Sequence, residues 1–261
     1  MKVLDMFRLE GKVALITGGY GLYGSQMTLA LAEAGATVIT ASRNLEKNEA
    51  YAASLRAQGL QVYAESFDQS DDESVKGLLA RLTDRFGGVD ILVNNSVLRC
   101  FKDYHGPAES FAESMAVNAT GLFLMCRAFG DHMAARGSGS MINIGSYMGD
   151  LGCNETLYEG CEHITSVGAA DYYFHKGGMH NLTRFMASRY GPKGVRVNCL
   201  SLGGFFNNQP EPFLKAYAKA TFLGRMAGSE DVKGILVYLA SDASQYMTGA
   251  VIPLDGGYSA K

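Results

Sequence analysis

Residues 171–178, DYYFHKGG, place two tyrosines directly ahead of a lysine. On a helix, side chains three or four positions apart are neighbours, so Tyr172 and Tyr173 could each lie beside Lys176. A phenol ordinarily titrates near about 10, and a nearby ammonium lowers its pKa by stabilising the phenolate. The pattern therefore predicts a tyrosine that exchanges protons near neutral pH. Spacing alone leaves open which of the two tyrosines it is.

A glycine-rich stretch near the N-terminus has the spacing of a phosphate-binding turn. Residues 17–24, TGGYGLYG, place Gly19, Gly21 and Gly24 in a G-x-G-x-x-G pattern between an expected strand and an expected helix. Glycines there allow a tight turn and let the backbone approach a pyrophosphate, whose charge the helix N-terminus stabilises. The stretch therefore predicts a dinucleotide site.

The second expected strand is followed by Ser42 and Arg43, with no acidic residue beside them. In a Rossmann site these positions meet the adenosine ribose. A carboxylate there would accept hydrogen bonds from a 2′-hydroxyl, whereas an arginine pairs with a 2′-phosphate. We therefore expect NADP as the cofactor. NAD is the alternative, if Arg43 is only an exposed residue that opens the next helix.

Short β-branched runs alternate with helix-length segments along the chain, which implies a parallel sheet covered on both faces. The expected strands are 12–17, 36–41, 60–65, 89–94, 140–145, 195–200 and 250–255, and the helix after the glycine turn is expected at 25–35. No linker, repeat or low-complexity segment interrupts them. We expect an α/β chain with a single domain over 1–261, a Rossmann fold with a doubly wound parallel sheet.

Composition argues against several classes of protein. Hydrophobic residues make up 47% of the chain, so we expect a large core. The net charge is −3, so we do not expect a basic surface that would bind nucleic acid or an anionic membrane. No apolar stretch has the length of a signal peptide or a membrane span, and the five cysteines form no close pairs. A cytoplasmic location follows. Cys153, Cys161 and His163 lie close in sequence but lack a fourth zinc ligand, so no metal is expected.

Together these motifs resemble the short-chain dehydrogenase/reductase superfamily over essentially the whole chain. The resemblance rests on TGGYGLYG, Asp68 in SFDQSD, NNSV at 94–97, Asn118 in AVNATG, Ser146 in INIGS, Tyr172 with Lys176, and SLGG at 201–204. The family pattern is Tyr-x-x-x-Lys, which only Tyr172 satisfies, so the resemblance selects Tyr172 and leaves Tyr173 as a packing residue.

The resemblance also implies a mechanism and a set of site residues. Tyr172 would exchange a proton with the substrate oxygen while hydride moves between the substrate carbon and the nicotinamide. Ser146 would hold the same oxygen, Lys176 would bind the nicotinamide ribose, and Asn118 would hold a water that passes protons to solvent. The implied cofactor contacts are Gly18, Tyr20, Gly21, Leu22, Tyr23, Ser42, Arg43, Asp68, Gln69, Asn95, Ser96, Val97, Tyr172, Lys176, Gly203, Phe205 and Asn207.

The chain departs from the family pattern in some residues and in length. Leu22 stands where the glycine motif commonly has its middle glycine, and Ser96 with Val97 replaces the usual Ala-Gly. The stretch between Ser146 and Tyr172 is longer than in typical members. We expect a long active-site loop at about 147–170, and within it we expect the segment 150–168 to be a substrate-selecting lid outside the folding core. The substrate contacts expected near it are Ser146, Tyr158, Glu159 and His163.

Two segments, LYEG at 157–160 and GGFFNNQPEPFLKAY at 203–217, resemble a subgroup linked to bacterial surface-glycan and sugar metabolism. The implied function is an NADP-dependent oxidoreductase that interconverts an alcohol and a ketone or aldehyde on a hydroxylated, sugar-like substrate. The alternative is a non-catalytic dinucleotide sensor or interaction protein on the same scaffold. Helices expected to start near Phe111 and Asp171 correspond to a pair that packs against a second subunit in the family, which implies a homotetramer or homodimer.

Overall fold

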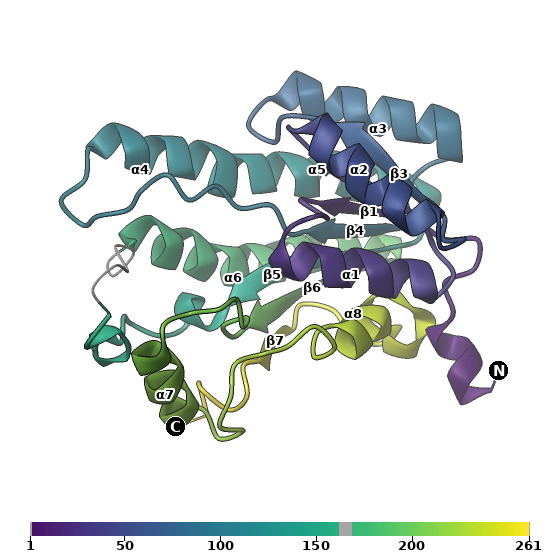
Figure 1. The fold of residues 1–261 in the computed structure, drawn as a ribbon. Helices are drawn as coiled ribbons and strands as arrows, with labels where there is room; N and C mark the ends of the chain where they lie inside the picture. The colour runs from purple at the N-terminus through teal and green to yellow at the C-terminus, as the bar shows by residue number, and fades with distance from the viewer. Residues whose placement is uncertain (1, 162–168, 261) are drawn as a thin grey trace.

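The computed structural model describes residues 2–161 and 169–260. All the expected strands form one parallel sheet of seven strands in the order β3-β2-β1-β4-β5-β6-β7, so the predicted doubly wound fold is confirmed (Figure 1). The strands are β1 Val13–Thr17, β2 Thr37–Ser42, β3 Val62–Ser66, β4 Ile91–Asn94, β5 Gly139–Ser146, β6 Val195–Leu202 and β7 Val251–Leu254. The strand order reverses between β1 and β4. Ligands of such sheets bind at that point, beyond the carboxyl ends of the strands.

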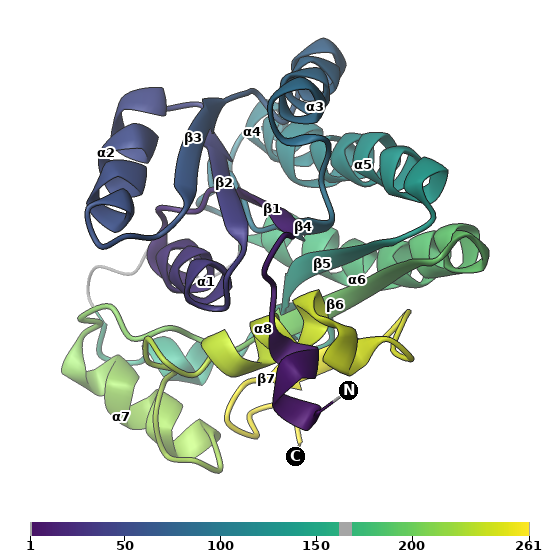
Figure 2. The same ribbon diagram turned by 90° about the vertical axis from the view of Figure 1, so that its right-hand side faces the viewer.

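Helices cover both faces of the sheet, and Figure 2 shows the two groups on opposite sides. One face is covered by α1 (Leu22–Glu33), α2 (Leu45–Arg56) and α8 (Lys233–Ala240). The other is covered by α3 (Asp72–Phe86), α5 (Leu122–Arg136) and α6 (Ala170–Tyr190). None of the described helices is both long enough and apolar enough to cross a bilayer.

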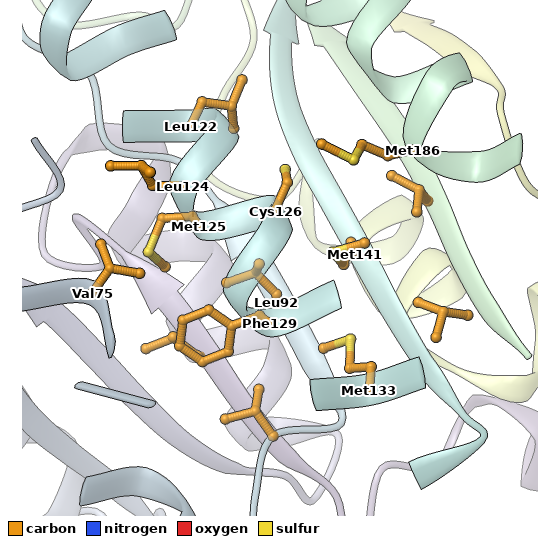
Figure 3. Close-up of a cluster of buried hydrophobic side chains, with 14 of the residues drawn as sticks. Val75, Leu92, Leu122, Leu124, Met125, Cys126, Phe129, Met133, Met141 and Met186 are labelled. Atoms are coloured by element: carbon orange, nitrogen blue, oxygen red, sulfur yellow. The ribbon is translucent and has the colours of Figure 1, made fainter. Parts of the chain in front are cut away.

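The central strands β1 and β4 are buried and largely apolar because each lies between two hydrophobic layers. Along β1, Leu15 packs into the cluster under α3, α5 and α6, while its neighbours Ala14 and Ile16 pack into the cluster under α1, α2 and α8. Figure 3 shows the first cluster, where Phe129 and Met133 of α5 lie against the sheet. Burial on both faces makes the sheet a rigid support for the loops at its carboxyl edge.

The helix at α1 begins earlier than expected. It starts at Leu22, with Gly21 as its N-cap, rather than at residue 25. Gly24 therefore lies inside the first turn of the helix, where a Cβ atom would come 2.2 Å from the carbonyl oxygen of Gly18. Only glycine fits there, because the helix packs directly on the turn that precedes it.

The expected helix near Phe111 is interrupted by a π-helical turn. It consists of α4 (Ala108–Met115), the π-helical residues Ala116–Gly121, and then α5. Such turns are rare and are frequent at functional sites. This one carries Asn118.

The first half of the long loop packs into the protein. A short 3-10 turn, Glu155–Tyr158, lies against α7 (Glu211–Ala220), and the side chain of Leu157 is 3% exposed. Leu157 belongs to a third hydrophobic cluster with Phe213 and Tyr217 of α7. The expectation that the loop lies outside the folding core is therefore wrong for this turn, because its one leucine inserts between aromatic side chains.

We expect Leu157→Ala to lower the free energy of unfolding by about 2–3 kcal/mol, the usual cost of deleting a buried leucine side chain. Chemical denaturation followed by circular dichroism measures this change. Glu155→Ala is the matched control, because Glu155 is exposed in the same turn and should alter stability little. A Leu157→Ala protein as stable as the parent would contradict the packing of this turn.

Candidate active site

A cavity of about 840 Å³ lies at the carboxyl edge of the sheet. Its walls come from the residues that follow β1, β2, β3, β4, β5 and β6, together with residues of α6 and α7. This is the position that the reversal of strand order predicts for a ligand. The volume lies in the upper part of the range of about 300–1,000 Å³ that is usual for ligand pockets.

The glycine turn forms one end of the cavity. Gly18 has a φ of +65°, and a Cβ atom on Gly19 would lie 2.3 Å from the hydroxyl of Thr40, so both positions require glycine. No side chain caps the first turn of α1, which leaves its backbone N–H groups free to face the cavity. Free N–H groups at a helix N-terminus bind phosphate. The residues present therefore fit a pyrophosphate.

Hydrogen bonds join the glycine turn to the residues after β4, although Ser96 and Val97 replace the usual Ala-Gly there. The side-chain amide of Asn95 donates to the carbonyl oxygens of Thr17, at 2.9 Å, and Gly18, at 3.0 Å. The backbone N–H of Ser96 donates to the hydroxyl of Thr17 at 2.9 Å. The usual Ala-Gly is therefore not needed to hold this backbone in place.

The opposite end of the cavity carries Ser42, Arg43 and Asp68. Arg43 is exposed, and its guanidinium is free to meet an anion. Hydrogen bonds from the hydroxyl and N–H of Ser70, together with the charge of Arg43, lower the pKa of Asp68 below its ordinary value. Asp68 therefore stays ionised and can accept hydrogen bonds.

Between these ends, β5 and α6 bring Ser146, Tyr172 and Lys176 together on the cavity wall. Burial by itself would raise the pKa of Tyr172. The positive charges of Lys176 and Arg99 oppose it, as do hydrogen bonds from Ser146 and Arg99, and the net effect lowers the pKa below its usual value. The ammonium of Lys176 is 4% exposed and donates to the carbonyl oxygen of Ile144 at 2.5 Å. The lysine is thus held in one position under the tyrosine.

The neighbouring Tyr173 has a different environment. It does not line the cavity, and burial raises its pKa above the ordinary value, with a hydrogen bond to Cys153 acting in the same direction. Of the two tyrosines, only Tyr172 therefore combines a place on the cavity with a nearby ammonium. The side chain of His175 is 3% exposed and packs edge-on against Tyr172, and burial lowers its pKa to about 3. It is neutral near pH 7 and does not add charge beside Lys176.

Asn118 does not reach the cavity wall. Its side-chain oxygen accepts from the N–H of Leu98 at 2.8 Å, and its amide donates to the carbonyl of Leu98 at 2.7 Å and to the hydroxyl of Ser114 at 3.0 Å. The π-helical turn thus fastens the loop after β4. Because that loop carries the cavity residues Ser96 and Val97, Asn118 positions them.

The structure places most, but not all, of the predicted residues on the cavity. The predicted residues that line it are Gly18, Tyr20, Gly21, Leu22, Tyr23, Ser42, Arg43, Asp68, Gln69, Asn95, Ser96, Val97, Ser146, Tyr158, Tyr172, Lys176, Gly203 and Phe205. Asn118, Glu159 and Asn207 are not among the lining residues, and His163 lies outside the described residues. Gln209 lines the cavity near Asn207, whose N–H donates to the side-chain oxygen of Gln209 at 2.7 Å.

The sequence does not predict that Arg99 and the aromatic residues Phe213 and Tyr217 belong to the site. The guanidinium carbon of Arg99 lies 4.5 Å from the ring centroid of Tyr172. Phe213 and Tyr217 of α7 line the cavity, and the hydroxyl of Tyr217 accepts from the N–H of Gly204 at 2.6 Å. These residues lie far from Tyr172 in sequence, so no local spacing indicates the contact. Arg99 lies in a loop shortly after NNSV, and it is not part of any sequence motif that would indicate a functional role.

A doubly wound sheet with a glycine turn at its switch point defines the class of Rossmann dinucleotide-binding proteins. The family model described as Enoyl-(Acyl carrier protein) reductase matches residues 23–259. The gluconate 5-dehydrogenase of Gluconobacter oxydans is 31% identical, over 97% of this chain and 96% of that protein. The galactitol 2-dehydrogenase (L-tagatose-forming) of Cereibacter sphaeroides is 32% identical, over 99% of each.

Solved structures agree with these matches. A gluconate 5-dehydrogenase from Burkholderia cenocepacia, crystallised in complex with NADP and tartrate, superimposes with a TM-score of 0.89 at 30% identity and covers 100% of both chains. The chain belongs to the short-chain dehydrogenase/reductase family. The resemblance seen in its motifs is therefore confirmed over almost its whole length.

Proposed function

We propose that this protein is an NADP-dependent oxidoreductase that interconverts an alcohol and a ketone or aldehyde on a hydroxylated, sugar-like substrate. The observation that carries the proposal is the group of Ser146, Tyr172 and Lys176 on a cavity whose other walls fit a dinucleotide. The relatives named gluconate 5-dehydrogenase and galactitol 2-dehydrogenase support a sugar acid or polyol as the substrate.

The preference for NADP rests on Arg43. Its exposed guanidinium lines the end of the cavity where the adenosine ribose would lie, and an arginine pairs with a 2′-phosphate through two parallel hydrogen bonds. The solved structure of a similar gluconate 5-dehydrogenase holds NADP, which supports the same cofactor here.

The reaction follows from the protonation states of the site. NADP held on this cavity would supply or accept the hydride, and the residues of the chain bind and orient the substrate and move the proton. Tyr172 exchanges a proton with the substrate oxygen, and its lowered pKa makes the phenolate easier to form than that of an ordinary tyrosine. Ser146, at the end of β5, hydrogen-bonds the same oxygen and fixes it beside the phenol. Lys176 stabilises the phenolate by its charge, and Asn118 holds the loop after β4 in place.

The alternative, a non-catalytic dinucleotide sensor, has less support because Ser146, Tyr172 and Lys176 meet on one wall. The test is an absorbance assay at 340 nm with NADP⁺ or NADPH and a panel of polyols, aldonates, sugars and ketones. We expect turnover on at least one member of the panel. Tight cofactor binding with no turnover on any member would favour the sensor.

A homodimer or homotetramer is part of this proposal, and the outer faces of α5 and α6 support it. Phe123, Phe174 and Phe185 on these helices are 38%, 67% and 59% exposed. Aromatic side chains are enriched at interfaces and costly to leave in water. We expect mass photometry to show a dimer or tetramer, and a monomer alone would contradict the proposal. All five cysteines are unpaired, which supports the proposal of a cytoplasmic location.

A further inference from the structure

Arg99 is a charged residue on the cavity wall to which none of the family motifs assigns a role. It is exposed and lies in the loop after β4, with its guanidinium carbon 4.5 Å from the ring centroid of Tyr172. No carboxylate among residues 2–161 and 169–260 forms an ion pair with it. Among the described residues Arg99 therefore has no carboxylate partner, and its guanidinium lies over the phenol ring of Tyr172, at the reacting part of the cavity.

The charges around the cavity are unevenly distributed. Among the residues that the structure describes, the charged residues that line it are Arg43, Asp68, Arg99 and Lys176. Arg43 and Asp68 lie at the adenosine end, so both charged residues at the substrate end are positive. The remaining described residues of that end are uncharged, such as Tyr147, Tyr158 and Phe213. Such a site favours an anion over a neutral molecule of the same shape.

The position of Arg99 also limits where the anion must lie. In the proposed reaction the phenol of Tyr172 would contact the oxygen on the carbon that is oxidised or reduced. A guanidinium stacked on the ring of Tyr172 therefore reaches groups a few bonds from that carbon. Arginine has five N–H donors in a planar fork, so contact with the tyrosine leaves donors for a carboxylate, which the fork matches in shape.

Resting on the function proposed above, we propose that the substrate is a polyhydroxy carboxylic acid and that Arg99 binds its carboxylate. Neutral polyols of the same length lack the group that Arg99 requires. The aromatic wall of Tyr147, Tyr158 and Phe213 packs against the carbon chain, while the carboxylate satisfies the charge of Arg99. Arg99 therefore determines specificity in addition to lowering the pKa of Tyr172.

The test compares matched anionic and neutral substrates, D-gluconate with D-sorbitol and D-threonate with D-threitol, for the parent protein, Arg99→Met and Arg99→Lys. Assays are run on the pH plateau of each variant, so that a change in the pKa of Tyr172 does not enter. We expect kcat/KM on the acids to fall by about 10- to 100-fold in Arg99→Met, mainly through KM, because a hydrogen-bonded charge pair is lost. Values for the polyols should change only a few-fold, and Arg99→Lys should restore part of the activity on the acids.

Two further measurements distinguish binding of the substrate carboxylate by Arg99 from binding of the cofactor and from a general effect of net charge. The dissociation constant of NADP⁺, followed by fluorescence, should be the same in Arg99→Met, whereas inhibition by tartrate, a hydroxy dicarboxylate, should weaken. Lys102→Met is the control for net charge, since Lys102 is an exposed residue nearby that does not line the cavity, and it should alter none of these values.

The outcomes distinguish this inference from the proposed function. Turnover by the parent protein on polyols but not on acids, or an equal loss on both in Arg99→Met, would overturn the carboxylate subsite and leave the oxidoreductase proposal standing. No turnover of any alcohol or ketone would overturn the proposed function. A large rise in the dissociation constant of NADP⁺ would show instead that Arg99 binds the cofactor.

Discussion

Replacing Tyr172 by phenylalanine is expected to reduce kcat by about 10²- to 10⁴-fold, the usual contribution of a positioned general acid or base. The variant removes the hydroxyl that exchanges a proton with the substrate and leaves the ring in place. Because the glycine turn and Arg43 lie at other parts of the cavity, the affinity for NADP should stay the same. Turnover is measured at 340 nm, and cofactor binding by fluorescence titration.

Tyr173→Phe is the matched control. Tyr173 lies on the same helix one residue away, but its hydroxyl does not reach the cavity and burial raises its pKa. Its removal should leave kcat within a small factor of the parent value. Similar losses in the two variants would show that the assignment of Tyr172 is mistaken.

The pH profile gives an independent check on the same residue. In the direction of alcohol oxidation the phenolate of Tyr172 is the active form. The rate should therefore rise with pH, reach half its maximum at the pKa of Tyr172 and level off above it, and Lys176 and Arg99 hold that pKa below the ordinary value of about 10. In Arg99→Met one of these charges is lost, so the plateau should begin at a higher pH. An unchanged profile would mean that the guanidinium does not influence the phenol.

The parts of this protein that the sequence predicts correctly are those that local rules determine. The central strands β1 and β4 are short apolar runs because they are buried on both faces, and the glycine turn has fixed spacing between β1 and α1. The start of α1 was placed too late because Leu22 and Tyr23 carry no capping signal. A helix that begins on a glycine N-cap has no side chain to mark it.

The parts that the sequence does not predict depend on contacts between distant segments. Leu157 reads as one apolar residue in a polar loop, and only the approach of α7 makes it part of the core. Arg99 is separated from Tyr172 by α4 and α5, so its position over the phenol follows from the packing of three helices. The contacts of Asn118 with the backbone of Leu98 and the hydroxyl of Ser114 also depend on the fold, and its role in holding a water stays a prediction.

The second prediction with a large expected effect is a reversal of the preference for NADP over NAD. We expect the parent protein to bind NADP more tightly than NAD, and the double variant Ser42→Asp/Arg43→Ala to reverse that order. The arginine supplies a charge-assisted pair to the 2′-phosphate, worth about 1.5–3 kcal/mol, or roughly 10- to 100-fold in affinity. The new carboxylate repels the phosphate and accepts hydrogen bonds from a 2′-hydroxyl. The combined change in the ratio of the two dissociation constants should exceed the change from either single variant.

Controls for the cofactor test use residues close to Arg43. Lys47→Ala removes a positive charge from the first turn of α2, but Lys47 does not line the cavity, so the preference for NADP should persist. Arg43→Ala also removes a charge that lowers the pKa of Asp68, and the single variant measures that contribution by itself. Isothermal titration with both cofactors gives the dissociation constants. Tighter binding of NAD by the parent protein would show that Arg43 only opens α2 and that the cofactor is NAD.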